Sequence, residues 1–127
     1  MTKILVAEDD KDIRELIVLT LSFNGFEVKS VEDGARAVAE APGKNYDLIL
    51  MDVQMPEMDG IAATHEIRHN LNLDFTPRIV AMTANALVGD REKYLAAGMD
   101  DYLSKPVRID ELREVLQRGY QEISSLS

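Results

Sequence analysis

Five short apolar runs alternate along the chain with longer segments in which apolar residues recur at helical spacing. The runs predict five β-strands, at Lys3–Ala7, Glu27–Val31, Asp47–Asp52, Arg78–Thr83 and Asp101–Ser104. The segments between them predict five helices, around Ile13–Leu21, Gly34–Ala41, Ile61–Leu71, Ala86–Ala97 and from Ile109 onward. One apolar face of the first helix is marked by Ile13, Leu16, Ile17, Thr20 and Leu21. Five successive strand–helix units favour an α/β fold in which a parallel sheet carries helices on both faces.

The size and composition indicate one acidic globular domain. The 127 residues carry a net charge of −9, and 46% of them are hydrophobic. The negative charge argues against a nucleic-acid partner and against an anionic membrane surface. The absence of cysteine excludes disulfides and thiolate metal sites. No signal peptide or membrane span is evident, so we expect a cytoplasmic protein without membrane insertion, with a core over about residues 3–118 and a polar, fraying tail over residues 121–127.

Charged and hydroxyl side chains follow four of the predicted strands. The first strand is followed by Glu8, Asp9 and Asp10, the third ends in Asp52, the fourth ends in Thr83, and the fifth is followed by Lys105. Parallel strands end at one edge of a sheet, where open α/β folds bind ligands. If the first strand neighbours the third, Glu8, Asp9 and Asp52 meet in one pocket, and their mutual repulsion favours a divalent cation such as Mg²⁺. Asp10 fits a cap of the first helix equally well.

The same residue types suit phosphoryl transfer. Asp52 lies at the end of the continuously apolar run Leu48–Met51, and a carboxylate can attack phosphorus to form an aspartyl phosphate. Such a transfer depends mainly on positioning and on neutralising the phosphoryl oxygens. Lys105 would supply a positive charge and Thr83 a hydroxyl donor, while the small Ala84 would leave room for a phosphodonor.

These residues occur in motifs that resemble the receiver domain of response regulators in two-component signalling. The matching motifs are Glu8-Asp9-Asp10, Asp52 with Met55-Pro56 and Asp59-Gly60, Thr83-Ala84, and Lys105-Pro106, within a resemblance from about Lys3 to Leu116. The resemblance implies a flavodoxin-like, doubly wound sheet of five parallel strands in the order 2-1-3-4-5, with five helices on two faces. The segments Met82–Ala86, Gly89–Asp90 and Gly98–Leu103 further resemble receivers of hybrid sensor kinases or stand-alone phosphorelay receivers.

The resemblance also implies roles for single residues. The implied phosphoacceptor is Asp52. The implied Mg²⁺ ligands are Glu8, Asp9, Asp52 and the backbone carbonyl of Gln54. The implied phosphoryl-binding residues are Thr83, Ala84 and Lys105, and the implied switch pair is Thr83 and Tyr102. The peptide bond between Lys105 and Pro106 is expected to be cis.

The implied function is a signalling switch rather than an enzyme with a substrate of its own. The chain would take a phosphoryl group onto Asp52 from the phosphohistidine of a histidine kinase or a histidine phosphotransfer protein. Phosphotransfer and autodephosphorylation would be self-catalysed, and the changed surface would act on another protein or pass the group onward. Such a domain works in the cytoplasm, alone or as the cytoplasmic part of a membrane-bound hybrid kinase. The downstream partner is not specified by the sequence.

Other functions fit the sequence less well. A phosphatase of the haloacid dehalogenase type needs a second aspartate two residues after the nucleophile, where this chain has Gln54. A flavin-binding flavodoxin needs a loop rich in serine, threonine and glycine, where Glu8–Lys11 is acidic. A receiver that serves only for docking would have lost an acid or Lys105, and none is lost. His65 and His69 have the spacing of zinc ligands, but no third ligand is evident and we expect a solvated helix face.

Overall fold

The computed structural model of the chain describes residues 2–43, 45–53, 55, 58–69, 77–83 and 90–126. Its strands are β1 (Lys3–Ala7), β2 (Glu27–Val31), β3 (Leu48–Asp52), β4 (Arg78–Thr83) and β5 (Asp101–Ser104). Its helices are α1 (Lys11–Phe23), α2 (Gly34–Glu40), α3 (Gly60–His69), α4 (Asp90–Ala96) and α5 (Ile109–Leu126), with a 3-10 turn η1 (Ala41–Gly43) after α2. The predicted succession of strands and helices is therefore confirmed over the described residues.

The strands form one parallel sheet in the order β2-β1-β3-β4-β5, as predicted. β3 is the central strand and is buried along its whole length, which explains its uninterrupted apolar sequence. Ala7 at the end of β1 lies beside Met51 in the register, so the residues that follow β1 emerge next to Asp52. The strand order reverses between β1 and β3, which is where open α/β sheets bind ligands.

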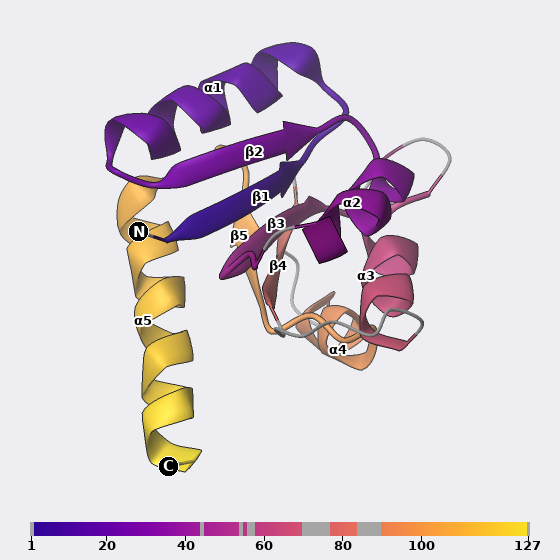
Figure 1. The fold of residues 1–127 in the computed structure, drawn as a ribbon. Coiled ribbons are helices and arrows are strands. Elements are labelled where there is room, and N and C mark those ends of the chain that lie inside the picture. Colours follow the sequence, from indigo (N-terminus) through magenta and orange to yellow (C-terminus); the bar gives the residue numbers. More distant parts are fainter. Residues whose placement is uncertain are drawn as a thin grey trace.

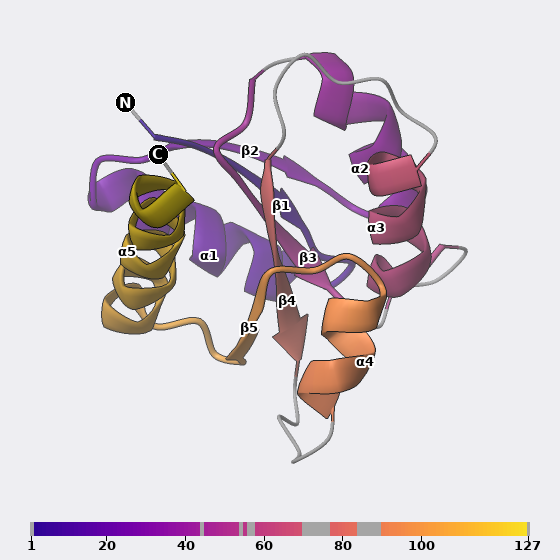
Figure 2. The same ribbon diagram turned by 90° about the horizontal axis from the view of Figure 1, so that it is seen from below.

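Helices cover both faces of the sheet. α1 and α5 lie on one face and α2, α3 and α4 on the other, as Figures 1 and 2 show from two directions. The core under α1 and α5 includes Ile4, Val6, Ile17, Leu21, Leu112 and Val115. The core under the other helices includes Leu5, Ile49, Ala63, Ile67 and Tyr94. Neighbouring residues of β1 thus belong to opposite cores, as the two-residue repeat of a strand requires.

α1 buries less apolar surface than its sequence predicts. Ile17 and Leu21 are buried against the sheet, but Ile13 is 37% exposed and Leu16 is 59% exposed. The predicted five-residue face was therefore too wide. α1 packs over β1 and the edge strand β2 (Figure 1), so only a narrow stripe of the helix meets the sheet.

One helix end differs from the prediction, and another falls where the comparison cannot be made. α5 continues as a helix to Leu126, through the segment that was expected to fray, and Figure 1 shows its last turns extending past the sheet. The extension follows from the sequence, because Leu116 and Ile123 keep the helical spacing of apolar residues. The first part of the predicted fourth helix, residues 86–89, lies outside the described residues.

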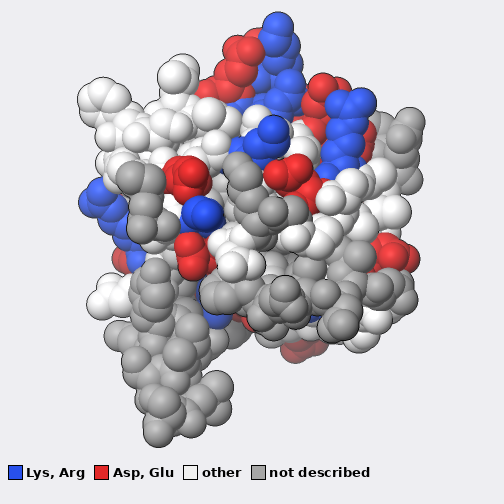
Figure 3. All heavy atoms as spheres, viewed as in Figure 1, with Lys and Arg blue, Asp and Glu red and all other residues white. Residues whose placement is uncertain are grey.

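Charged side chains of both signs are interspersed on the face shown in Figure 3. Charged side chains also tie elements of the fold together. Arg68 on α3 pairs with Asp100 at 2.6 Å and donates a hydrogen bond to the carbonyl oxygen of Gly98 at 3.0 Å. These contacts fix the end of α3 against the connection between α4 and β5. Within the described part of the chain, no helix combines the length and the apolarity that crossing a bilayer requires.

Candidate functional site

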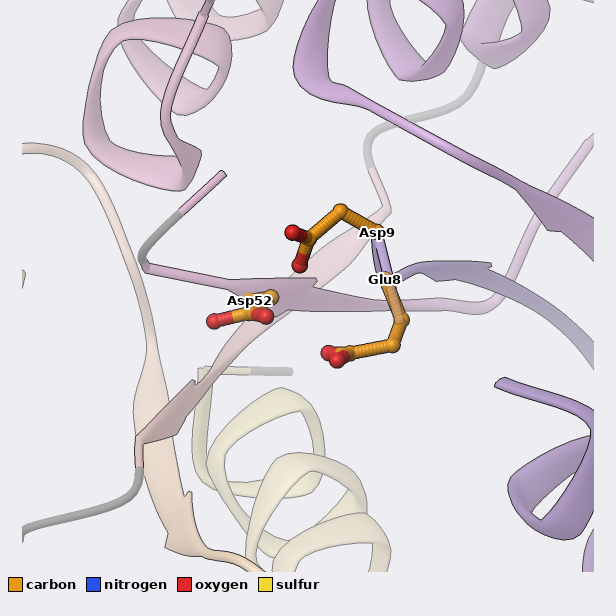
Figure 4. Close-up of side chains that lie close together, drawn as sticks. All are labelled: Glu8, Asp9 and Asp52. Atoms are coloured by element: carbon orange, nitrogen blue, oxygen red, sulfur yellow. The ribbon is translucent and has the colours of Figure 1, made fainter. Parts of the chain in front are cut away.

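The carboxylates of Glu8, Asp9 and Asp52 meet at the carboxyl edge of the sheet. Each can offer one ligand oxygen, and these oxygens lie within 4.8 Å of one another. Figure 4 shows Glu8 and Asp9 reaching from the end of β1 and Asp52 from the end of β3 into a common space. The cavity there has a volume of about 250 Å³ and is lined by Glu8, Asp9, Asp10, Ile13, Asp52, Val53 and Lys105. The neighbouring positions of β1 and β3 therefore bring the predicted acids together.

The arrangement of these acids fits a hard divalent cation. Glu8 is 1% exposed and Asp52 3% exposed, whereas Asp9 is exposed. Carboxylates this close repel one another, and burial removes the water that would screen them. A cation with oxygen ligands relieves both penalties, and an all-oxygen donor set suits Mg²⁺ better than a transition metal. Gln54, the predicted further ligand, lies outside the described residues.

Lys105 places a positively charged ammonium group in contact with Glu8 and Asp52. Its main-chain N–H donates to the carbonyl oxygen of Thr83 at 2.8 Å, which ties the residue to the end of β4. Its Nζ lies 2.8 Å from Asp52 Oδ2. The same Nζ lies 3.1 Å from Glu8 Oε1 and 2.8 Å from Glu8 Oε2. The peptide bond between Lys105 and Pro106 is cis.

Burial and neighbouring charges shift the pKa values of Glu8 and Lys105. Burial raises the pKa of Glu8 from 4.5 to about 7, and Asp52 adds to the rise while Lys105 opposes it. Burial by itself lowers the pKa of Lys105, but hydrogen bonds to Asp52 and Glu8, and the charges of these acids, raise that pKa above 10.5. Lys105 is therefore charged throughout the physiological range, and Glu8 holds its proton to a higher pH than a free carboxyl group does.

Thr83 and Tyr102 lie on neighbouring strands near this edge. Thr83 ends β4 and is buried, and the half-buried Tyr102 in β5 has its ring centroid 6.2 Å from that of Tyr94 on α4. The register pairs Thr83 with Ser104 and places Tyr102 two residues earlier in β5. Their coupling as a switch stays a prediction. Ala84 lies outside the described residues.

Asp10, Ile13 and Arg14, at the start of α1, also contribute to the site. The sequence analysis identified only part of their roles. Asp10 caps α1, because its Oδ1 accepts a hydrogen bond from the N–H of Ile13 at 3.1 Å. The side chain of Ile13 lines the cavity. Arg14 donates from Nη1 to the carbonyl oxygens of Glu8 at 3.0 Å and Asp9 at 3.4 Å. Arg14 was missed, although a cation near a helix N-terminus, where the dipole disfavours it, is a signal that the sequence offers.

The histidine pair on α3 is a solvated surface feature. His65 and His69 are both exposed, with ring centroids 4.4 Å apart. Over the residues that the structure describes, the acids around Asp52 are the only group of three or more metal-ligand side chains close enough to share an ion. The histidines therefore play no part in the site.

Comparison with known proteins identifies the kind of domain to which this site belongs. The family model described as the response regulator receiver domain matches residues 4–117. Hybrid signal transduction histidine kinase G of Dictyostelium discoideum is 41% identical over 118 residues, which are 91% of this chain and 3% of that kinase. The chain thus spans only a small part of this curated relative.

Solved structures share the fold and part of the sequence. The receiver domain of the sensor histidine kinase PA1611 from Pseudomonas aeruginosa, determined with a magnesium ion in its active-site cleft, is 44% identical, with a TM-score of 0.80 and coverage of 92% of this chain and 95% of that one. The receiver domain of Ssk1 from Saccharomyces cerevisiae was crystallised with the histidine phosphotransfer protein Ypd1. That structure matches at 28% identity with a TM-score of 0.80, over 91% of this chain and 86% of the matched one.

Proposed function

The chain belongs to the response regulator receiver domain family of two-component signalling, and on that premise we propose that it accepts a phosphoryl group on Asp52 from a phosphohistidine of another protein. The observation that carries the proposal is the position of Lys105 Nζ, 2.8 Å from Asp52 Oδ2 in a cavity shared with Glu8 and Asp9. Asp52 is the acid at the end of the central strand, and it is in direct contact with the ammonium group. The proposed role is that of a signalling domain and not of an enzyme that turns over a substrate.

The proposed transfer is a displacement at phosphorus. A carboxylate oxygen of Asp52 forms a bond to the phosphorus atom while the bond from phosphorus to the donor imidazole nitrogen breaks. The electron pair of that bond stays on the imidazole, which takes up a proton. The products are an aspartyl phosphate and a free histidine.

Charge neutralisation is the main contribution of the surrounding residues. The Lys105 ammonium would move from its contact with Asp52 to the phosphoryl oxygens, where it acts as a point charge. The hydroxyl of Thr83 and the space at Ala84 are proposed to serve the same oxygens. Mg²⁺ would be held by Glu8, Asp9, Asp52 and the backbone carbonyl of Gln54, and when bound it supplies further positive charge beside the phosphoryl group. The magnesium ion in the active-site cleft of the PA1611 receiver domain supports magnesium as the cation.

An apolar row on α1 supports a protein as the phosphodonor. Ile13 lines the cavity, and the row continues outward through Leu16, Leu19 and Phe23, which are 59%, 68% and 93% exposed. Large apolar side chains gathered on one exposed helix side mark a protein contact. We propose that a helical histidine phosphotransfer domain or kinase packs on this row. The crystallised complex of Ypd1 with the Ssk1 receiver is a precedent for such a partner.

Output is proposed to follow from the new charge at Asp52. Drawing Thr83 toward the phosphoryl group would let Tyr102 turn inward and remodel the surface formed by α4, β5 and α5. The phosphorylated domain would then act through that surface on a downstream protein or pass its phosphoryl group onward. The two states need to differ by only a few kcal/mol for phosphorylation to shift their populations.

Two donors test the proposal. The chain is incubated with Mg²⁺ and either a phosphorylated histidine phosphotransfer protein or acetyl phosphate, and phosphorylation is followed by intact mass. The parent should gain one phosphoryl group from each donor, and Asp52→Asn should gain none. Phe23→Asp should react normally with acetyl phosphate but about tenfold more slowly with the protein donor. Leu95→Asp, at a 42% exposed leucine on α4, is the matched control and should match the parent with both donors. Full phosphorylation of Asp52→Asn would refute the proposed acceptor.

A further inference from the structure

Arg14 holds the main chain of the two acids that follow β1. The half-buried side chain reaches back from α1, and its Nη1 donates to the carbonyl oxygen of Glu8 at 3.0 Å and to that of Asp9 at 3.4 Å. These bonds go to backbone oxygens and not to the carboxylates. One nitrogen therefore fixes two consecutive peptide groups of the segment that carries both acids.

The segment needs such a hold, because its side chains repel one another. The Glu8, Asp9 and Asp52 carboxylates lie within 4.8 Å, and two of them are buried. On the strand side, the N–H of Glu8 donates to the carbonyl oxygen of Val31 at 3.2 Å. On the helix side, Asp10 caps α1. Between these two anchors, the carbonyl oxygens of Glu8 and Asp9 accept hydrogen bonds from Arg14, which restrain the backbone of both acids.

The location of Arg14 is electrostatically unfavourable for the helix and for a metal. A cation in the first turns of a helix opposes the helix dipole. A cation beside a site for Mg²⁺ also repels the incoming ion. The charge of Arg14 therefore does not favour metal binding. Any favourable effect of Arg14 on Mg²⁺ affinity has to come from the geometry that it imposes on the acids.

We propose that Arg14 is a positioning residue for the metal site: by clamping the carbonyl oxygens of Glu8 and Asp9 it keeps their carboxylates converged on Asp52 for Mg²⁺. The inference rests on the proposed function, because that function supplies the ion. It makes a prediction with a definite sign. Removing the positive charge of Arg14 would by itself tighten Mg²⁺ binding, whereas removing its hydrogen bonds to the carbonyl oxygens of Glu8 and Asp9 weakens it.

The test measures Mg²⁺ affinity by calorimetry on the whole chain, with stability followed by circular dichroism. Arg14→Ala should bind Mg²⁺ about tenfold more weakly than the parent, as expected when a residue that orients metal ligands is removed. Arg14→Lys keeps the charge but has a compact ammonium in place of the guanidinium fork. It should lose affinity by a smaller factor, and it remains informative if Arg14→Ala fails to fold.

Arg36 offers a matched control. It lines the same hollow of about 530 Å³ as Arg14, but its guanidinium pairs with Glu32 at 3.1 Å and Asp33 at 3.6 Å. Arg36→Ala should bind Mg²⁺ at least as tightly as the parent. Unchanged or tighter binding in both Arg14 variants overturns the positioning role and leaves the proposed function intact. A parent protein that binds no Mg²⁺ overturns the proposed metal site as well as this inference.

Discussion

Glu8 is a buried acid of the site whose pKa lies well above that of a free carboxyl group. Its carboxyl group is 1% exposed and lies against Lys105 and Asp52. Burial, with a smaller contribution from Asp52, raises its pKa to about 7. A cation that binds there must displace the proton, so metal affinity should rise with pH over the range in which Glu8 titrates.

The raised pKa of Glu8 predicts a pH-dependent stability in the absence of metal. The folded protein binds this proton more tightly than the unfolded chain, so the contribution is fully present below about pH 4.5 and is lost as the pH rises through about 7. The loss should be on the order of 2 kcal/mol. Urea unfolding at about pH 5 and about pH 8 with a chelator measures it. Glu8→Gln should lose less stability over this interval than the parent, and equal losses would contradict the titration of Glu8.

Site residues differ in how well the sequence predicts them. Glu8, Asp9, Asp52 and Lys105 could be predicted because each ends or follows a strand, and strand ends in a parallel sheet share one edge. Arg14 could not be assigned its contact, because hydrogen bonds to main-chain oxygens leave no pattern in side-chain types. The pKa of Glu8 also depends on packing that no spacing rule contains.

At the scale of elements, the start of α3 is packed directly against the end of β3. A Cβ on Gly60, the first residue of α3, would meet the carbonyl oxygen of Asp52 and lie 2.8 Å from the Cγ of Met51. We predict that Gly60→Ala lowers the free energy of unfolding by roughly 1–3 kcal/mol and also weakens Mg²⁺ binding. The second effect follows because the backbone that carries Asp52 must shift. Denaturant unfolding and calorimetry measure the two effects.

Gly25 provides a control for that substitution. Its φ is +90°, and an added Cβ would meet nothing within 4 Å. Gly25→Ala should lower stability by roughly 1–2 kcal/mol through backbone strain alone and leave Mg²⁺ affinity unchanged. If Gly60→Ala likewise left the affinity unchanged, the contact between α3 and β3 would have no role in placing Asp52.

The paired strands β4 and β5 carry the predicted switch. Thr83→Ala should still accept a phosphoryl group, because Asp52, the metal and Lys105 remain, but its conformational response should be lost. Amide NMR shifts over residues 95–116, with and without beryllium fluoride, report that response. A variant that shifts there as fully as the parent would show that the hydroxyl is not the relay.

α1 also shows that helical periodicity in the sequence does not tell how much of an apolar helix face is buried. The apolar residues of α1 have the spacing of a buried face, yet Ile13 and Leu16 are exposed. Spacing tells which residues share a side of a helix, but the neighbours that cover that side depend on tertiary packing. α1 lies over the β2 edge of the sheet, so part of its apolar surface faces outward and is available to a partner.

At the scale of the whole molecule, strand order determines which side chains meet at the site. The order β2-β1-β3-β4-β5 puts the end of β1 beside the end of β3, and the end of β5 within reach of both through Lys105. The alternation of strands and helices in the sequence predicts a parallel sheet, but only the family motifs selected this order from among the possible ones. Residues far apart in the chain meet in one cavity because of that order.

The central claim is that Asp52 receives the phosphoryl group, and chemical trapping tests it most directly. Borohydride reduces an acyl phosphate to an alcohol, so it converts a phosphorylated aspartate to homoserine and leaves free aspartate unchanged. After phosphorylation with Mg²⁺ and acetyl phosphate, reduction and peptide mass spectrometry, homoserine should appear at position 52 and at no other aspartate. Homoserine at Asp9, Asp10 or Asp59 in place of Asp52, or none at all in protein that has gained the phosphoryl group, would contradict the account.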